Sequence, residues 1–403
     1  MTSTGRFLVG INYWPRETAM FWWRRFDLAC VRRDFSLLAD FGFDLVRIFL
    51  LWEDFQPEIR RVSVSCLDRL VQVAETAHES RIKILPTFFT GYMSGMNWLP
   101  PWMLESSGEK GRFSIFSDGQ VLQAGIRNMY GEKEVLKAQK LLLHETTGAL
   151  QGHPAVWGYD LGNEPLNLVI PPSKDRARAW LEEMVLELKR YDSDIPVTLG
   201  LGQQDLEEDR VLGPGEVASA CDLLAVHAYP CYAAWAEGPL DWRASLFVAL
   251  LASWLGGKKV LLEGFGVPTD PGRTALPEEE RERLGGVELV PEEDAALYYG
   301  KVLEVLSAYG FPGGMAWCFS DFEPRLWEVS PLREHVHERY FGLFRWDGSP
   351  KEGAGRIAGA GRGPASTEAS LDWIDLRPDD YYERPGEHLE RLYQRFKERF
   401  QEV

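Results

Sequence analysis

The chain has 403 residues, of which 45% are hydrophobic and 26% are charged, a composition that excludes disordered and fibrous proteins. The 61 Asp and Glu residues outnumber the 44 Lys and Arg residues and give a formal net charge of −17. Because a surface this acidic repels phosphate backbones, we expect no nucleic-acid partner.

Short apolar segments alternate with longer amphipathic segments along the chain. The apolar segments predict strands at residues 7–13, 45–52, 82–89, 156–161, 196–201, 223–229, 260–264 and 315–319. Helical spacing predicts helices at 31–41, 65–79, 132–150, 244–254 and 291–310, and a further helix with Ser173 as its N-cap. Strands that alternate with helices predict a parallel sheet, and their continuous apolar character indicates burial on both faces. We therefore expect an α/β fold with a single (β/α)8 TIM barrel; a doubly wound open sheet is the alternative.

Two segments interrupt this alternation. Residues 90–131 predict an extended loop after the third strand, and long ordered loops are usually functional. Residues 351–368 are rich in Gly and Ala and predict a flexible link. We expect the catalytic barrel to span residues 1–350 and residues 369–403 to form a C-terminal helical tail that packs on it.

Two glutamates fall at the C-terminal ends of predicted strands. Glu164 follows the fourth strand, and Glu263 lies near the end of the seventh. In a (β/α)8 barrel, side chains at these ends converge on one pocket. Paired carboxyl groups are what glycoside hydrolysis needs, one to protonate the leaving oxygen and one to attack or to activate water. The alternative is that each is a solvated loop residue, but both follow apolar segments of the sheet.

Four motifs carry a family resemblance: GYDLGNEP at residues 158–165, VHAYP at 226–230, LLEGFG at 261–266 and MAW at 315–317. Together with GINYWP at 10–15 and VRIF at 46–49, they resemble glycoside hydrolase family 5, a family of retaining β-glycosidases on (β/α)8 barrels. The resemblance covers roughly residues 5–345. It implies a double displacement in which Glu164 is the acid/base and Glu263 is the nucleophile.

The resemblance also implies roles for the residues around this pair. Asn163 would hold the sugar 2-hydroxyl, and His227 would line the site. Arg47 and Tyr229 would hydrogen-bond Glu263. Trp317 would form the floor of the −1 subsite.

From the residues alone, these positions have other interpretations. Arg47 could form a structural ion pair with Asp44 or Glu53, because a buried guanidinium requires a carboxylate. His227 and Tyr229 could be core residues with satisfied hydrogen bonds, and Trp317 could serve barrel packing.

Further aromatic residues near strand ends are candidate sugar-stacking platforms, because the apolar faces of pyranose rings pack on indole and phenol rings. They are Tyr13, Trp14, Trp52, Trp98 and Trp102. Some of them are expected to belong to the core.

Hydrolysis by two carboxylates needs no cofactor and no metal ion, and we expect neither. Residues 353–358 imitate a dinucleotide fingerprint, but no strand leads into them within a βαβ unit. His335 and His337 form a two-residue pair without a third ligand, which is typical of surface histidines. No signal peptide and no apolar segment long enough for a transmembrane helix is visible in the sequence, so we expect a cytoplasmic protein without a membrane partner.

The substrate is expected to be an oligosaccharide or polysaccharide. NYWP at 12–15 and FLLWEDFQP at 49–57 resemble mannan-acting members of the family, and FGLFRWDGSPK at 341–351 resembles exo-acting β-glycosidases. We therefore expect a β-mannosidase, with an endo-β-1,4-mannanase and an endo-β-1,4-glucanase as alternatives. A carbohydrate-binding barrel without catalysis is the alternative from a different class. The oligomeric state is not predicted.

Overall fold

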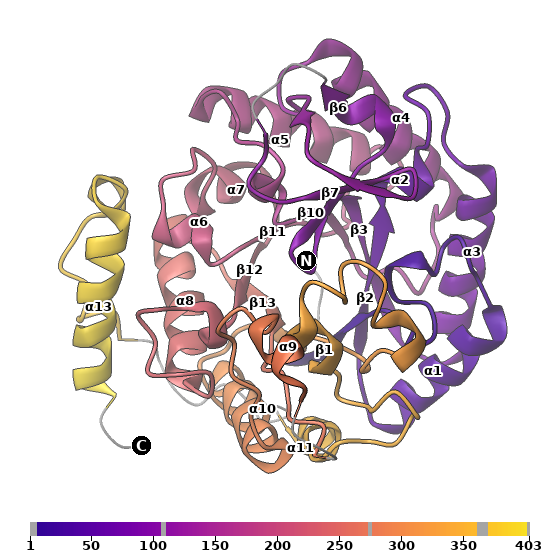
Figure 1. The fold of residues 1–403 in the computed structure, drawn as a ribbon. Helices are drawn as coiled ribbons and strands as arrows, with labels where there is room; N and C mark the ends of the chain where they lie inside the picture. Colours follow the sequence, from indigo (N-terminus) through magenta and orange to yellow (C-terminus); the bar gives the residue numbers. More distant parts are fainter. Residues whose placement is uncertain (1–5, 106–109, 273–275, 361–369, 401–403) are drawn as a thin grey trace.

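The computed structural model describes residues 6–105, 110–272, 276–360 and 370–400. Eight parallel strands form a closed barrel in the order β1-β14-β13-β12-β11-β10-β3-β2 (Figure 1). They are β1 (Leu8–Tyr13), β2 (Leu45–Leu51), β3 (Lys83–Thr90), β10 (Tyr159–Asn163), β11 (Val197–Leu201), β12 (Leu224–Ala228), β13 (Val260–Phe265) and β14 (Gly313–Ala316). The predicted (β/α)8 barrel is confirmed, and the open sheet is wrong, because β1 pairs with both β2 and β14.

Helices between the strands form the outer layer. They include α1 (Leu28–Asp40), α3 (Val64–Glu79), α4 (Lys133–Ala149), α5 (Lys174–Leu188), α7 (Pro214–Ala220), α8 (Trp242–Gly256) and α10 (Glu292–Ala308). Side-chain caps at Asp27, Ser63 and Ser173 fix where α1, α3 and α5 begin. Within the described ranges, no helix is long and apolar enough to cross a membrane.

The barrel interior has an apolar layer below a polar one. Leu45, Leu85, Leu261 and Met315 pack together as a small buried cluster inside the barrel. Because side chains alternate along a strand, the residues two positions further on point the same way, and these include Arg47 and Glu263. The apolar layer thus forms a floor under charged groups that lie nearer the C-terminal ends of the strands.

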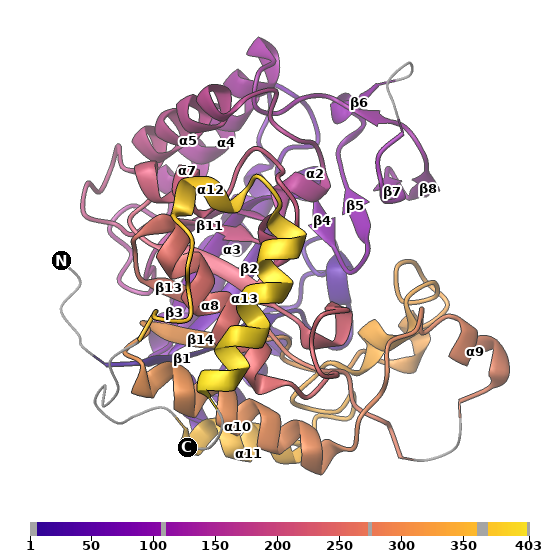
Figure 2. The ribbon, with the colours of Figure 1, turned by 90° about the vertical axis from the view of Figure 1, so that its left-hand side faces the viewer.

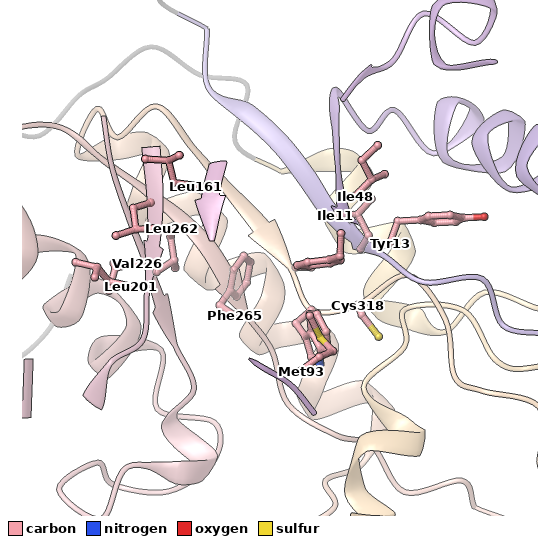
Figure 3. Packing of buried hydrophobic residues seen from close by; sticks show 14 of the residues in the cluster. Ile11, Tyr13, Ile48, Met93, Leu161, Leu201, Val226, Leu262, Phe265 and Cys318 are labelled. Atoms are coloured by element: carbon pink, nitrogen blue, oxygen red, sulfur yellow. The ribbon is translucent and has the colours of Figure 1, made fainter. Parts of the chain in front are cut away.

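The larger apolar core lies between the strands and the helices. Figure 3 shows part of it, with Ile48, Leu161, Leu262 and Phe265 among the labelled side chains. On β1 the amide of Asn12 faces inward and donates to the backbone oxygen of Glu263, so the next residue, Tyr13, points outward to α1 (Figure 3).

The extended loop after β3 folds into small sheets. One has the order β4-β5-β7-β8 and consists of β4 (Tyr92–Met93), β5 (Met96–Trp98), β7 (Ile115–Ser117) and β8 (Gln120–Leu122). A second pairs β6 (Leu104–Glu105) with β9 (Gly125–Ile126). The described parts of the loop are thus joined to one another by strand pairing, and residues 92–95 line a pocket at the barrel mouth.

The segment predicted as a flexible link begins with a helix instead. Residues Glu352–Gly359 form α11, which packs on α10, and its Ala354 and Ile357 are buried. A Cβ on Gly353 would lie 3.3 Å from side-chain atoms of Leu343 and Tyr299, so at this position the small residue serves close packing. Residues 361–368 of the predicted link lie outside the described residues.

The C-terminal tail contains α12 (Pro378–Tyr381) and α13 (Pro385–Arg399). Tyr393 and Phe396 of α13 pack on Phe247 of α8, with ring centroids 5.0 and 5.6 Å apart. The Tyr381 hydroxyl donates to the backbone oxygen of Leu206 in α6 (Gln204–Glu207). Figure 1 shows α13 lying outside the ring of barrel helices, beside α6 and α8, and Figure 2 shows it in front of the barrel.

Candidate active site

A pocket of about 480 Å³ opens at the C-terminal ends of the barrel strands. Asn163, Glu164, His227, Tyr229 and Trp317 all line it, so five of the predicted site residues meet in one cavity. A groove of about 870 Å³ lies outside the barrel along α8, α10 and α11, away from these strand ends. The smaller cavity is the candidate active site, because it holds the convergent titratable groups.

Glu164 sits where β10 ends and has a left-handed backbone conformation, with φ of 45° and ψ of 54°. This conformation is unusual for a residue with a side chain, and such backbone geometry occurs preferentially at functional sites. One carboxyl oxygen, Oε1, lies 2.7 Å from Nδ1 of His227, and Oε2 accepts a hydrogen bond of 2.8 Å from the Asn167 amide. The side chain is 11% exposed, so the carboxyl group reaches the pocket while its orientation is fixed from two sides.

Glu263 on β13 is fully buried beneath the pocket. Its Oε2 lies 3.1 Å from Nη2 of Arg47 and 3.6 Å from Nε2 of His227. Neither carboxyl oxygen accepts a well-aligned hydrogen bond from the described residues. The predicted hydrogen bond from Tyr229 is therefore wrong; its hydroxyl lies against Gly264. A buried carboxylate with an ion pair but free lone pairs is typical of a functional group rather than a structural one.

Arg47 supplies the positive charge of the polar layer. Its guanidinium donates to Asp160 at 2.6 Å, to Thr87 at 2.9 Å and to Asn12 at 3.3 Å, and it forms the ion pair with Glu263. Burial disfavours the charged form, but Glu263 and Asp160 outweigh it, and the pKa of Arg47 is raised.

The alternative partners of Arg47 considered from the sequence are wrong. Asp44 pairs with Arg6, and Glu53 pairs with Arg24.

Asp160 was missed as a site residue, although it stands in the GYDLGNEP motif. Its Oδ1 accepts from the backbone N–H groups of Gly162 and Gly200, and its Oδ2 accepts from Arg47. Burial raises the pKa of Asp160 to about 6, Glu263 adds to this, and Arg47 opposes it. Asp160 therefore positions Arg47 beneath Glu263.

His227 connects the two glutamates, because its two ring nitrogens face Glu164 and Glu263. Nη1 of Arg47 lies 3.2 Å from Nε2. Since a guanidinium can only donate, we assign Nε2 as the acceptor and place the ring proton on Nδ1, where it donates to Glu164. Burial lowers the pKa of His227, but the hydrogen bond to Glu164 and the nearby Glu263 carboxylate outweigh it, and the net pKa is raised.

Asn163 and Trp317 both line the pocket. The Asn163 amide donates to the backbone oxygen of Tyr92 at 3.0 Å, so this residue is tied to the extended loop. Trp317 is largely buried and its ring lies edge-on to Phe49, which also lies under the Arg47 guanidinium.

The five candidate stacking aromatics do not line the pocket. Tyr13 packs among Trp22 and Phe35 and donates to Asp34, because alternation on β1 turns it away from the barrel interior. Trp14 is buried and stacks on Phe49. The indole N–H groups of Trp52 and Trp102 donate to Gln56, and Trp98 is buried against Phe21 and Phe116. Tyr13, Trp14, Trp52 and Trp98 are buried in the core, and the prediction of sugar platforms is wrong for them. Trp102 is half-buried against the core, and its role as a platform stays a prediction.

The pocket also contains residues that the sequence analysis missed or set aside. Tyr92, Ser94, Arg112, Gln203, Tyr232 and Glu338 line it, and so do His335 and His337. The two histidines were interpreted as surface residues, but His337 is buried. These additional lining residues come from loops after different strands, so no local sequence pattern connects them. In the described part of the chain, no group of three or more His, Cys, Asp or Glu residues is arranged to hold a metal ion.

No protein-family model matches the sequence, and no curated protein matches it. Solved structures do resemble it. A GH5_18 variant from Streptomyces cattleya in complex with Manb1-4GlcNAc has a TM-score of 0.70 and 23% identity, covering 88% of this chain and 79% of that chain. A GH5_18 protein from Bifidobacterium longum subsp. infantis has a TM-score of 0.73 and 20% identity, covering 93% and 85%.

An exo-beta-1,4-mannosidase from Opitutaceae bacterium strain TAV5 has a TM-score of 0.69 and 22% identity, covering 89% of this chain and 61% of that chain. At these identities the similarity establishes the fold. The resemblance to family 5 that the sequence motifs indicated is thus confirmed: the whole barrel of this chain is similar to those of the GH5_18 structures.

Proposed function

We propose that the protein is a retaining glycoside hydrolase of family 5 that releases single mannosyl residues from β-mannosides. The observation that carries the proposal is the meeting of Glu164 and Glu263, from two different strands, on the two nitrogens of His227 at the barrel mouth. Two convergent carboxyl groups in a pocket are the apparatus of glycoside hydrolysis.

In the proposed reaction, a carboxylate oxygen of Glu263 attacks the anomeric carbon. Glu164 protonates the glycosidic oxygen as the bond to the leaving group breaks. The covalent glycosyl-enzyme is then hydrolysed by water, whose proton passes to Glu164 and whose oxygen bonds to the anomeric carbon, so Glu263 is released. Arg47 stays ionised in its burial site and balances the charge of Glu263 before the attack and again after the glycosyl-enzyme is hydrolysed, since Glu263 is an uncharged ester in between.

The choice of a mannoside is supported by the structural neighbours. The Streptomyces cattleya structure contains Manb1-4GlcNAc, and the Opitutaceae protein is an exo-beta-1,4-mannosidase. Exo action is supported by the origin of the lining, since loops after several strands supply side chains to the pocket around Trp317. An endo-acting mannanase or glucanase would need an open cleft.

The experiment is hydrolysis of 4-nitrophenyl β-d-mannoside by the wild type, Glu263→Gln and the control Glu304→Gln on the exposed side of α10. We expect Glu263→Gln to lower kcat by about 10³-fold or more, since the nucleophile is lost, and Glu304→Gln to match the wild type. NMR should show the β-anomer as the first product, and the α-anomer would refute a retaining mechanism.

The same proteins separate the alternative functions. Mannobiose, mannohexaose and cellohexaose digested side by side should yield mannose from the first time point if the enzyme acts on chain ends. Mixed short oligomers would instead establish an endo-mannanase or an endoglucanase. A wild type that binds mannosides without any turnover would establish a carbohydrate-binding barrel.

A further inference from the structure

Besides Glu164, two carboxyl groups line the pocket, Glu207 and Glu338, and neither has a part in the two-glutamate reaction. Glu338 belongs to the short helix η6 (Val336–Tyr340), which follows β14, and it is 8% exposed. The Ser94 hydroxyl donates to its Oε2 at 3.0 Å, and the Tyr232 hydroxyl donates to its Oε1 at 3.1 Å. The indole of Trp317 is a further hydrogen-bond partner. Three loops after three different strands thus aim donors at one carboxyl group.

The surroundings of Glu338 supply little compensating charge. Within the described ranges, no Lys or Arg lies in ion-pair distance of it; the group within 4 Å is His337, at 3.7 Å. Burial, together with the nearby His335, lowers the pKa of His337 to about 4, so this ring is neutral near pH 7. Burial also raises the pKa of Glu338 itself, while the hydrogen bond from Ser94 and the charge of His335 oppose this shift. A buried acid without a Lys or Arg partner costs stability, and such groups are kept where they bind a ligand.

The hydrogen-bonding capacity of Glu338 is not filled by these partners. A carboxylate offers about four lone-pair sites, and Ser94, Tyr232 and Trp317 occupy three of them. Because the residue lines the pocket, the lone pair that these partners leave open is available to a sugar bound there. A sugar hydroxyl is a donor of the right kind for this position.

We propose that Glu338 accepts a hydrogen bond from a hydroxyl group of the terminal sugar, away from its anomeric carbon, and thereby makes the site specific for a neutral glycone. This rests on the proposed function, which places that sugar on Trp317. A uronic acid would bring its own carboxylate towards Glu338 and is rejected by charge repulsion.

The test compares Glu338→Ala and Glu338→Gln with the wild type on 4-nitrophenyl β-d-mannoside and on its 3-, 4- and 6-deoxy analogues. Losing a hydrogen bond to a charged group should lower kcat/KM of Glu338→Ala on the parent substrate by about 10–100-fold. On the analogue that lacks the bound hydroxyl, kcat/KM of the wild type should fall by a similar factor. Glu338→Ala should lower kcat/KM on that analogue by less than about threefold more, because the hydrogen bond is already absent. Glu328→Gln, an exposed residue of the same loop, serves as the matched control.

An equal penalty for Glu338→Ala on the parent and on all three analogues would overturn the proposal, since it would show a purely structural effect. Undiminished activity of both Glu338 variants would also overturn it. If Glu338→Ala does not fold, Glu338→Gln carries the same comparison, since its amide keeps the shape while removing one acceptor oxygen.

A binding measurement separates this proposal from the proposed function. Calorimetry with methyl β-d-mannoside needs no turnover, and Glu338→Ala should weaken binding by about 10-fold or more. A wild type that binds the mannoside through Glu338 but never hydrolyses mannosides would refute the hydrolase and retain the glycone site. If mannosides are hydrolysed equally well by the wild type and by both Glu338 variants, the hydrolase is retained and the role of Glu338 in binding the glycone is refuted.

Discussion

Gly200 on β11 is the position where a single methyl group should disable the site without unfolding the barrel. A Cβ at this position would lie 2.6 Å from Oε2 of Glu263 and 2.8 Å from Nη2 of Arg47. Ordinary van der Waals contacts begin at 3.4 Å. To make room in Gly200→Ala, the Glu263 carboxyl would have to move by about 0.8 Å, and a misplacement of about 1 Å can cost about 100-fold in rate. We therefore expect kcat/KM to fall by about 100-fold.

The assay is steady-state hydrolysis of 4-nitrophenyl β-d-mannoside together with urea unfolding. Overpacking of this kind costs about 1–3 kcal/mol, so Gly200→Ala should still fold. Gly355→Ala on α11 is the matched control, because a Cβ there would meet no atom within 4 Å. The expected decrease in kcat/KM is about 100-fold. A value for Gly200→Ala within about threefold of the wild type would refute the reasoning, because it would show that activity does not require the Glu263–Arg47 pair at its position in the structure.

Two further predictions concern stability. Burial raises the pKa of Asp205 to about 7 against the opposing charge of Arg210. The folded state therefore holds more protons than the unfolded state between about pH 4 and pH 7, and the free energy of unfolding should fall by up to about 1.4 kcal/mol per pH unit as the pH rises through this range. In urea unfolding, Asp205→Asn should remove this pH dependence and the exposed control Glu208→Gln should keep it, so equal slopes for the two variants would contradict the assignment. Phe396 is buried against Trp373 and Phe247. Phe396→Ala should therefore lower the free energy of unfolding in urea by about 3–5 kcal/mol and leave kcat/KM unchanged. A decrease below about 1 kcal/mol would mean that the C-terminal tail does not pack on the barrel in solution.

The barrel and the residues of its polar layer could be predicted because strand geometry constrains them. Strands that alternate with helices admit few folds, and a residue at the end of a parallel strand has one direction in which to point. Glu164, Glu263 and Arg47 lie on or directly after such strands, and the structure brings them together. Asp160 could have been found by the same rule, since it lies on β10 within a motif that was already recognised.

The prediction for the aromatic residues near strand ends did not take into account that side chains alternate along a strand. Tyr13 follows Asn12 on β1, and if Asn12 faces the barrel interior then Tyr13 cannot. The structure places Tyr13 and Trp14 in the core, and Trp14 acts on the site only through Phe49. Proximity to a strand end in the sequence is therefore a weaker predictor than the parity of the position along the strand.

The parts of the pocket that set its size could not be predicted in this way. Ser94, Tyr232 and Glu338 come from three loops with no shared periodicity, and Ser94 and Glu338 are 244 positions apart. Each is unremarkable alone: a serine, a tyrosine and one glutamate among 61 acidic residues. What distinguishes Glu338 is its burial without a Lys or Arg partner among the described residues, and burial is a property of the folded chain. In the proposed function, the reaction is carried by residues on the strands, whereas the sugar is selected by residues of loops that meet only after the barrel has closed.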